Sequence, residues 1–90
     1  MQFVNIGYSN LLNAQRVISV VSPDAAPIKR LVQDAREKGF AIDATGGKKT
    51  KAVIITDSNH VVLSALTPDA INARLRGGDA YEEEEDGDDK

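Results

Sequence analysis

The chain has 90 residues, no cysteine, 28% charged residues and a formal net charge of -3. This length allows one small domain, and the lack of cysteine excludes a disulfide framework or a thiolate metal site. The sequence contains no apolar run near the roughly 20 residues that span a bilayer and no signal-peptide pattern at its start, so we expect a cytoplasmic protein.

The first residues predict short strands. Residues 2–6 favour a strand and residues 8–10 a turn, whereas residues 11–15 fit either a strand or irregular chain. Residues 16–21 are rich in β-branched side chains and nearly all apolar. That composition predicts a strand that is buried on both faces.

A helix follows, with two possible starting points. Ser22-Pro23-Asp24 has the residues of a helix start, but Pro27 favours a later start near Ala26. Gly39 is suited to the position after the last turn, where a positive φ is usual. The spacing i, i+3, i+4, i+7 predicts one apolar stripe on this helix, made of Ile28, Leu31, Val32 and Ala35.

The second half of the chain predicts three more strands and a short helix. Residues 40–44 favour a strand, and residues 52–56 and 60–65 favour a hairpin joined by a polar turn. Residues 67–69 repeat the pattern of a capping residue before proline, and the helix they open ends at two glycines. The order predicts an α+β fold with a mainly antiparallel sheet.

The connection at residues 45–51 carries the clearest chemical signal. Lys48, Lys49 and Lys51 follow two glycines that let the backbone turn and approach another surface closely. Ammonium groups and hydroxyls are common phosphate contacts, so this flexible basic loop is a candidate DNA-binding site. The alternative is a solvated hairpin tip whose lysines only favour solubility.

Arg16 is the second candidate for DNA binding. Its planar guanidinium could hold a phosphate or a guanine edge with two hydrogen bonds. The alternative is an ion pair with Asp24, Asp43 or another acid. A further group of basic residues is interpreted as the solvated face of the first helix, although Arg30 could extend a basic surface: Lys29, Arg30 and Arg36.

Catalysis finds little support in the sequence. His60 is the single histidine and has no Ser or Cys partner at a recognisable spacing, so we expect a surface or strand-edge role. Asp43, Asp57 and Asp69 lie beside turns or caps, where aspartate commonly bonds local backbone. We therefore predict no catalytic residue, no metal site and no cofactor.

The charge is divided between two unlike segments. Residues 1–78 contain ten basic and six acidic side chains, a net charge of +4, and we predict that they form the folded domain. Residues 79–90 contain eight acids and one lysine, a net charge of -7, and this composition predicts disorder. The tail either competes with DNA for the basic domain or only aids solubility. So small a domain often gains burial by self-association.

Several stretches of the chain resemble the RemA family of bacterial regulators. They lie within residues 3–75 and comprise residues 5–8, 18–30, 33–36, 43–45, 52–55, 57–58 and 60–64. The resemblance implies a DNA-binding transcriptional regulator, linked in that family to biofilm extracellular-matrix genes. It also implies a ring-shaped homo-oligomer whose DNA contacts are similar to those of LytTR-type domains.

The family's DNA-contacting residues are matched here only in part. Arg16 matches the family pattern, whereas Lys48-Lys49 stands where the family has an Arg-Arg pair and Lys51 stands in place of a further Arg. Lysine keeps the charge that phosphate needs but lacks the planar fork that reads guanine. We expect double-stranded DNA binding with less base discrimination. The alternative is a structural or protein-interaction module whose basic surface binds an acidic protein.

Overall fold

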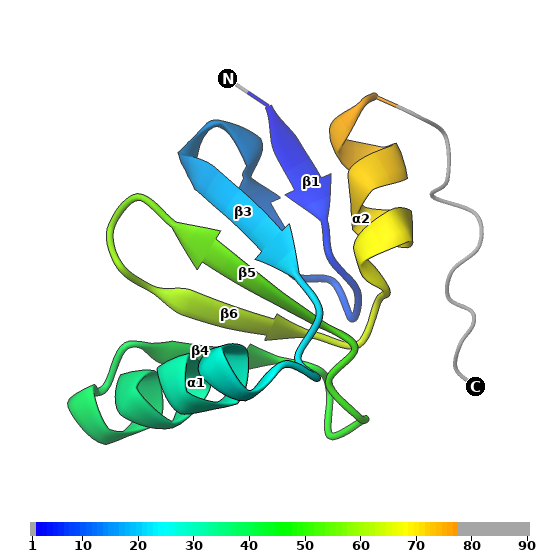
Figure 1. The fold of residues 1–90 in the computed structure, drawn as a ribbon. Coiled ribbons are helices and arrows are strands. Elements are labelled where there is room, and N and C mark those ends of the chain that lie inside the picture. Colours follow the sequence, from blue (N-terminus) through cyan, green and yellow to red (C-terminus); the bar gives the residue numbers. More distant parts are fainter. Residues whose placement is uncertain (1, 78–90) are drawn as a thin grey trace.

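A computed structural model describes residues 2–77, and the predicted acidic tail at residues 79–90 lies outside them. The elements in chain order are β1 (Phe3–Asn5), β2 (Leu11–Asn13), a 3-10 helix η1 (Ala14–Arg16), β3 (Val17–Val21), α1 (Ala26–Lys38), β4 (Ala41–Ala44), β5 (Ala52–Thr56), β6 (Val61–Ser64) and α2 (Pro68–Leu75). The predicted α+β class is confirmed (Figure 1).

The main sheet has four strands in the order β3-β5-β6-β4. The pairs β3–β5 and β5–β6 are antiparallel, whereas β4 lies parallel to β6. β1 and β2 form a separate antiparallel hairpin. The mainly antiparallel arrangement and the β5–β6 hairpin are as predicted. β4 is parallel to β6 because the chain reverses direction twice between them, once in the loop before β5 and once in the turn after it.

The sheet separates two cores because successive side chains of a strand point to opposite faces. Ile54 and Val62 lie in the core shared with β1 and α2, while Val53 and Leu63 lie in the core beneath α1. Figure 1 shows α1 on one face of the sheet and the β1–β2 hairpin with α2 toward the other. β5 and β6 are central strands and are almost fully buried.

The prediction that residues 16–21 form a strand buried on both faces is wrong. β3 is an edge strand, and the Ile18 side chain is 65% exposed. The register of β3 against β5 also shifts between Val17 and Ser19. An apolar β-branched run predicts a strand, but its place in the sheet depends on the topology. Arg16 ends η1, one residue before this strand begins.

Helix α1 follows the later of the two predicted starts. Ala25 caps it without a side-chain hydrogen bond, and Pro27 lies in the first turn. Ser22 instead accepts a hydrogen bond from the Asp24 N–H at 3.3 Å, before the helix. Gly39 ends the helix with φ 82°, as predicted.

The apolar stripe of α1 is only partly covered by the sheet. Ala35 is buried, and Ile28 and Val32 pack against the same core while remaining partly exposed. The Leu31 side chain is 36% exposed. The stripe was therefore predicted in the right place, but it is wider than the surface that the sheet covers.

Candidate nucleic-acid interface

Hydrogen bonds hold the first half of the basic loop in shape. The Asp43 carboxylate accepts bonds from the Thr45 N–H at 2.9 Å and the Thr45 hydroxyl at 2.6 Å. The Thr45 Oγ1 accepts from the Gly47 N–H at 3.3 Å, and the Thr45 carbonyl accepts from the Lys48 N–H at 3.1 Å. The loop predicted to be flexible is thus anchored at its base to the end of β4.

The charge of Asp43 depends on these same contacts. The hydrogen bond from the Thr45 hydroxyl is the main cause that lowers the pKa of the Asp43 carboxyl, followed by the Thr45 backbone bond. The positive charge of Arg36 adds to this lowering, and burial opposes it. Asp43 therefore bonds local backbone, as predicted for an aspartate beside a turn, and is ionised at neutral pH.

Two glycines give the loop its path. Gly46 and Gly47 have φ values of 63° and 85°. A Cβ built on Gly46 would lie 2.8 Å from the Tyr8 ring, whereas one on Gly47 would meet no atom within 4 Å. Gly46 is therefore required both by its backbone angle and by the close approach of Tyr8.

The three lysines of the loop project from this frame. Lys48, Lys49 and Lys51 are exposed, and none forms an ion pair with a residue in the range 2–77. The Lys51 N–H donates to the Ser64 carbonyl at 2.8 Å, which joins the end of the loop to β6. Within the described part of the chain, therefore, no carboxylate is bound to the three ammonium groups of the loop.

Arg16 has the ion pair that was one of its two predicted roles. Its Nε donates to Asp57 Oδ1 at 2.9 Å, and the two side chains are 57% and 47% exposed. The partner is Asp57, which lies in the turn after β5. The bond uses Nε alone, and the terminal amino groups have no partner among the residues described.

The fold does not bring Arg16 and the lysine loop together. The loop enters β5 at Ala52, whereas Asp57 follows the other end of β5. The five residues of β5 lie between Lys51 and Asp57, and the six residue-to-residue steps of extended chain correspond to about 20 Å. The predicted site residues therefore form two basic points at opposite ends of one strand.

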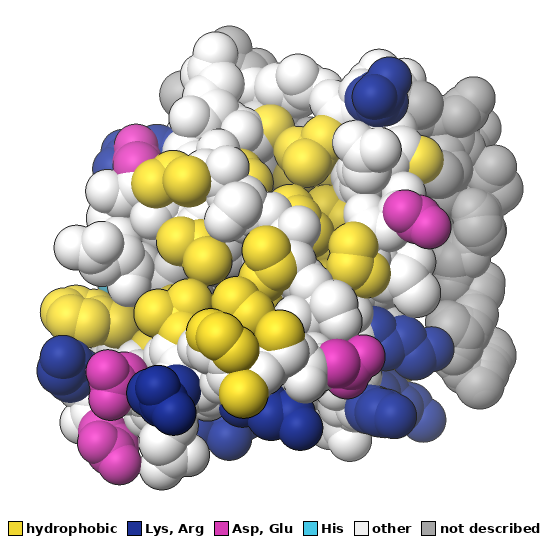
Figure 2. All heavy atoms as spheres, in the orientation of Figure 1, with side chains coloured by type: hydrophobic (Ala, Val, Ile, Leu, Met, Phe, Trp, Pro, Cys, Tyr) yellow, Lys and Arg dark blue, Asp and Glu magenta, His cyan; other side chains and the backbone are white. Residues whose placement is uncertain are grey.

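The structure adds two residues of α1 to the loop. Lys29 and Arg36 are seven positions apart on one side of the helix, and both line a pocket of about 290 Å³ together with Thr50. Buried Val53 and Leu63 form its apolar floor. Figure 2 shows basic side chains along the lower edge of the molecule, where α1 and the β4–β5 loop lie in Figure 1. The i, i+7 spacing could have indicated that Lys29 and Arg36 share one side of the helix. It could not have indicated that this side faces the loop.

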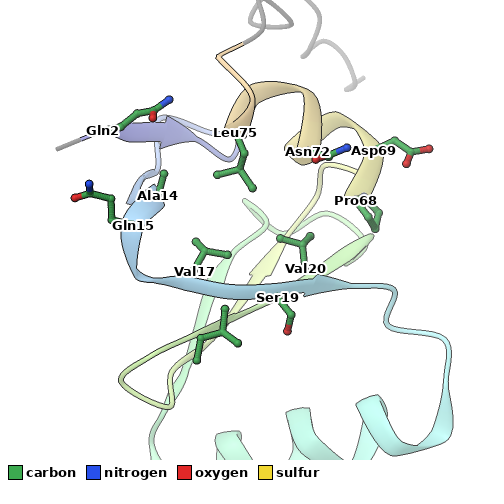
Figure 3. Close-up of a pocket in the computed structure, with 11 residues that line it drawn as sticks. Gln2, Ala14, Gln15, Val17, Ser19, Val20, Pro68, Asp69, Asn72 and Leu75 are labelled. Atoms are coloured by element: carbon green, nitrogen blue, oxygen red, sulfur yellow. The ribbon is translucent and has the colours of Figure 1, made fainter.

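A larger groove of about 640 Å³ lies between β3 and α2 (Figure 3). Val17 and Val20 point into it from β3, and Leu75 points into it from α2 (Figure 3). Its polar lining comes from Gln2, Gln15, Ser19, Asp69 and Asn72. This groove runs along the open edge of the sheet.

His60 has a local role in the β5–β6 turn. Its Nδ1 lies 2.7 Å from the Ser58 hydroxyl, and its ring packs edge-to-face on Phe40 with centroids 5.5 Å apart. This agrees with the expected position at a strand edge. Within residues 2–77 no group of three His, Cys, Asp or Glu side chains could hold a metal ion, and neither helix has the length and hydropathy of a membrane span.

The described residues thus form a small α+β domain with a basic loop before its central strand β5. The chain belongs to the RemA-like family (extracellular matrix regulatory protein A-like), whose sequence profile matches residues 3–75.

Relatives from several bacteria carry the provisional name of regulatory protein. A protein of Geobacillus thermodenitrificans is 58% identical over 84 residues, which cover 93% of this chain and 97% of the relative. A protein of Dictyoglomus thermophilum is 52% identical over 83 residues, covering 92% and 98%. One of Alkaliphilus metalliredigens is 49% identical over 85 residues, covering 94% and 91%. These matches extend over nearly the full length of each protein.

Proposed function

We propose that this protein is a DNA-binding transcriptional regulator that acts as a homo-oligomer in the cytoplasm. The observation that carries the proposal is the loop at residues 45–51, whose Lys48, Lys49 and Lys51 form no ion pair with any residue of the range 2–77. Its base is held by the Asp43–Thr45 bonds, so the lysines start from a defined backbone. Ammonium groups in this arrangement suit the sugar–phosphate backbone of double-stranded DNA.

Repetition of the domain would join its separate basic points. A single domain of net charge +4 offers few contacts, and Arg16 lies about 20 Å along β5 from the loop. In an assembly, the Arg16 and loop positions of successive copies form a longer basic track. Each further contact is then intramolecular, and avidity rises by orders of magnitude.

The edges of the sheet support self-association. β3 contains no charged or proline residue, although edge strands are commonly protected by such residues. Ile18 is exposed on this edge beside the groove of about 640 Å³, and Figure 2 shows apolar side chains across the face of β3 and α1. We propose that a second copy of the chain covers this surface.

A ring is favoured over a two-fold dimer because the two edges differ. The β3 edge exposes Ile18, and the opposite β4 edge exposes Phe40 and Ile42. Contact between two different surfaces is head-to-tail, and such contacts form a ring when the rotation between copies closes and an open filament when it does not. The family description, extracellular matrix regulatory protein A-like, makes biofilm matrix genes the proposed targets.

The salt dependence of DNA binding tests the proposal. The logarithm of duplex affinity should fall linearly with the logarithm of salt concentration, with a slope of about -0.9 for each phosphate neutralised. The double change Lys48→Ala with Lys49→Ala should flatten this slope by about 1.8 for each subunit in contact. The charge-matched control is Lys38→Ala with Arg76→Ala, which removes two exposed charges elsewhere.

Two results would contradict the proposal. One is a purified protein that ignores duplex DNA at low ionic strength, with binding to an acidic protein instead. The other is a loop variant with the same slope as the control variant. For a protein that passes both tests, genome-wide mapping of bound DNA would identify the regulated genes.

A further inference from the structure

Two basic residues of α1 lie beside the loop that carries three lysines. Lys29 and Arg36 of α1 line the pocket of about 290 Å³, and Thr50 completes its rim from the loop. Lys49 and Lys51 adjoin Thr50 in the chain, and Lys48 precedes them. We call this set the α1–loop surface: Lys29, Arg36, Lys48, Lys49 and Lys51.

The acidic groups near this surface do not neutralise it. Asp43 interacts with Arg36, but its carboxylate already accepts two hydrogen bonds from Thr45. None of the five basic side chains forms an ion pair with another residue of the described range. The surface therefore keeps a large positive charge and fits a polyanion.

A polyanion is present in the chain itself. Residues 79–90 contain eight acids and one lysine, and seven of the eight positions from Glu82 to Asp89 carry a carboxylate. The described chain ends at Gly77, directly after α2. Thirteen further residues reach up to about 45 Å when extended, which exceeds the longest principal extent of the molecule, 34 Å. The acidic run can thus reach the α1–loop surface of its own subunit or of a neighbouring copy.

We propose that the acidic segment Glu82–Asp89 binds the α1–loop surface and competes there with DNA. Tethering keeps the segment at an effective concentration in the millimolar range, so even weak ion pairs compete. The segment lowers nonspecific affinity most, because nonspecific binding depends almost entirely on phosphate contacts. The effect on DNA rests on the proposed function, whereas binding of the segment to the surface does not.

The first experiment detects this contact without DNA. Carbodiimide joins carboxylates directly to amines that touch them, and mass spectrometry locates the links. In the full-length protein at low salt we expect links from the acidic segment to Lys48, Lys49 or Lys51, and their loss in 0.5 M salt. Lys38, an exposed lysine at the far end of α1, is the internal control. Links to Lys38 as frequent as those to the loop, or no links at all, would overturn the proposal.

The second experiment measures competition with DNA. A full-length variant with Glu82 to Glu85 changed to Gln, and Asp86, Asp88 and Asp89 changed to Asn, keeps the length but removes the charge. Its affinity for nonspecific duplex at 50 mM salt should rise about three- to tenfold, and the gain should shrink at higher salt. In the Lys48→Ala with Lys49→Ala background the gain should be smaller.

The outcomes separate the two proposals. If neither protein binds duplex DNA at low salt while the cross-links form, the DNA-binding proposal fails and the contact stands. If the protein binds DNA but tail neutralisation leaves both affinity and salt slope unchanged, competition by the segment is refuted.

Discussion

Arg16 and Asp57 are joined twice across the sheet. The Asp57 N–H donates to the Arg16 carbonyl at 2.9 Å, and Arg16 Nε donates to Asp57 Oδ1 at the same distance. The backbone bond fixes η1 against the turn after β5, and the side-chain bond fixes the guanidinium on that turn. The side-chain bond uses Nε alone and leaves the terminal amino groups of Arg16 without a partner among the described residues.

Changing Asp57 to Asn tests this arrangement. The amide keeps an oxygen that accepts from Arg16 Nε and removes one negative charge beside the proposed contact. We expect a several-fold rise in duplex affinity at 50 mM salt, measured by fluorescence anisotropy, and a change in unfolding free energy below about 1 kcal/mol because the pair is exposed. Arg16→Ala should weaken binding instead. A loss of affinity in Asp57→Asn would contradict this account.

The loop lysines make a prediction about sequence discrimination. Lys48→Arg with Lys49→Arg conserves charge and adds two planar forks, each able to bond phosphate or guanine twice. The salt slope should stay the same, while the ratio of specific to nonspecific affinity should rise. Competition assays with a mapped target site and an unrelated duplex measure this ratio. If the ratio is unchanged, the loop contacts only phosphate, both with lysine and with arginine at these positions.

Changing Thr45 to Val tests how the loop base is held. The substitution removes the hydroxyl that bonds Asp43 and that accepts from the Gly47 N–H. The pKa of Asp43 should move up toward its ordinary value, which a pH titration of the side-chain carboxyl by NMR measures. Thr50→Val, at the other end of the loop, is the control and should leave the Asp43 pKa unchanged.

The direction of the pH effect follows from that lowered pKa. Because the folded-state pKa of Asp43 lies below the unfolded value, its charged form adds stability above about pH 3.9. This contribution is lost as the pH falls through the folded-state pKa. The stability difference between the wild-type protein and Thr45→Val should therefore narrow in acid. If the stability difference between the two proteins stays constant in acid, the stability lost in Thr45→Val comes from the Gly47 contact alone.

The two glycines of the loop form a matched pair. Gly47→Ala places a Cβ in open space at positive φ and should cost about 1 kcal/mol of unfolding free energy. Gly46→Ala adds the clash with the Tyr8 ring and should cost about 1 kcal/mol more. Urea unfolding measures both. In a Tyr8→Ala background the two substitutions should cost the same unfolding free energy. If Gly46→Ala still costs more there, the Tyr8 ring is not the cause of its extra cost.

Ile18 is the position at which to test assembly. Ile18→Glu places a charge on the uncharged β3 edge, and we expect smaller species in sedimentation velocity and weaker DNA binding through lost avidity. Leu11→Glu, with a similarly exposed side chain in β2, is the control and should keep the assembly. If the wild-type protein sediments as a monomer at working concentration, the oligomer proposal fails.

Local sequence signals predicted most of the elements. Gly39 marked the end of α1 and Thr67 the start of α2, because both act through backbone geometry within a few residues. The place of a strand in the sheet is decided by distant pairings, so the apolar run of β3 was wrongly predicted to be buried on both faces. The parallel pairing of β4 with β6 is likewise not a local property.

The candidate site was predictable to a similar extent. Charge and glycine content pointed to the loop of Lys48, Lys49 and Lys51, and the structure shows that loop exposed. The approach of Lys29 and Arg36 to Thr50 depends on how α1 crosses the sheet, which no spacing in the sequence specifies. The distance between Arg16 and the loop became apparent only once β5 was known to lie between them.

The five residues of β5 constrain how chains of this kind can change. An insertion of one residue within Ala52–Thr56 would reverse the direction of each following side chain, so Val53 and Ile54 would exchange places between the two cores. Packing would be lost in both cores at once, whereas the loop before β5 can lengthen without disturbing either core. Variation among such chains should therefore arise through the composition and length of the loop, while the strand that follows keeps its length.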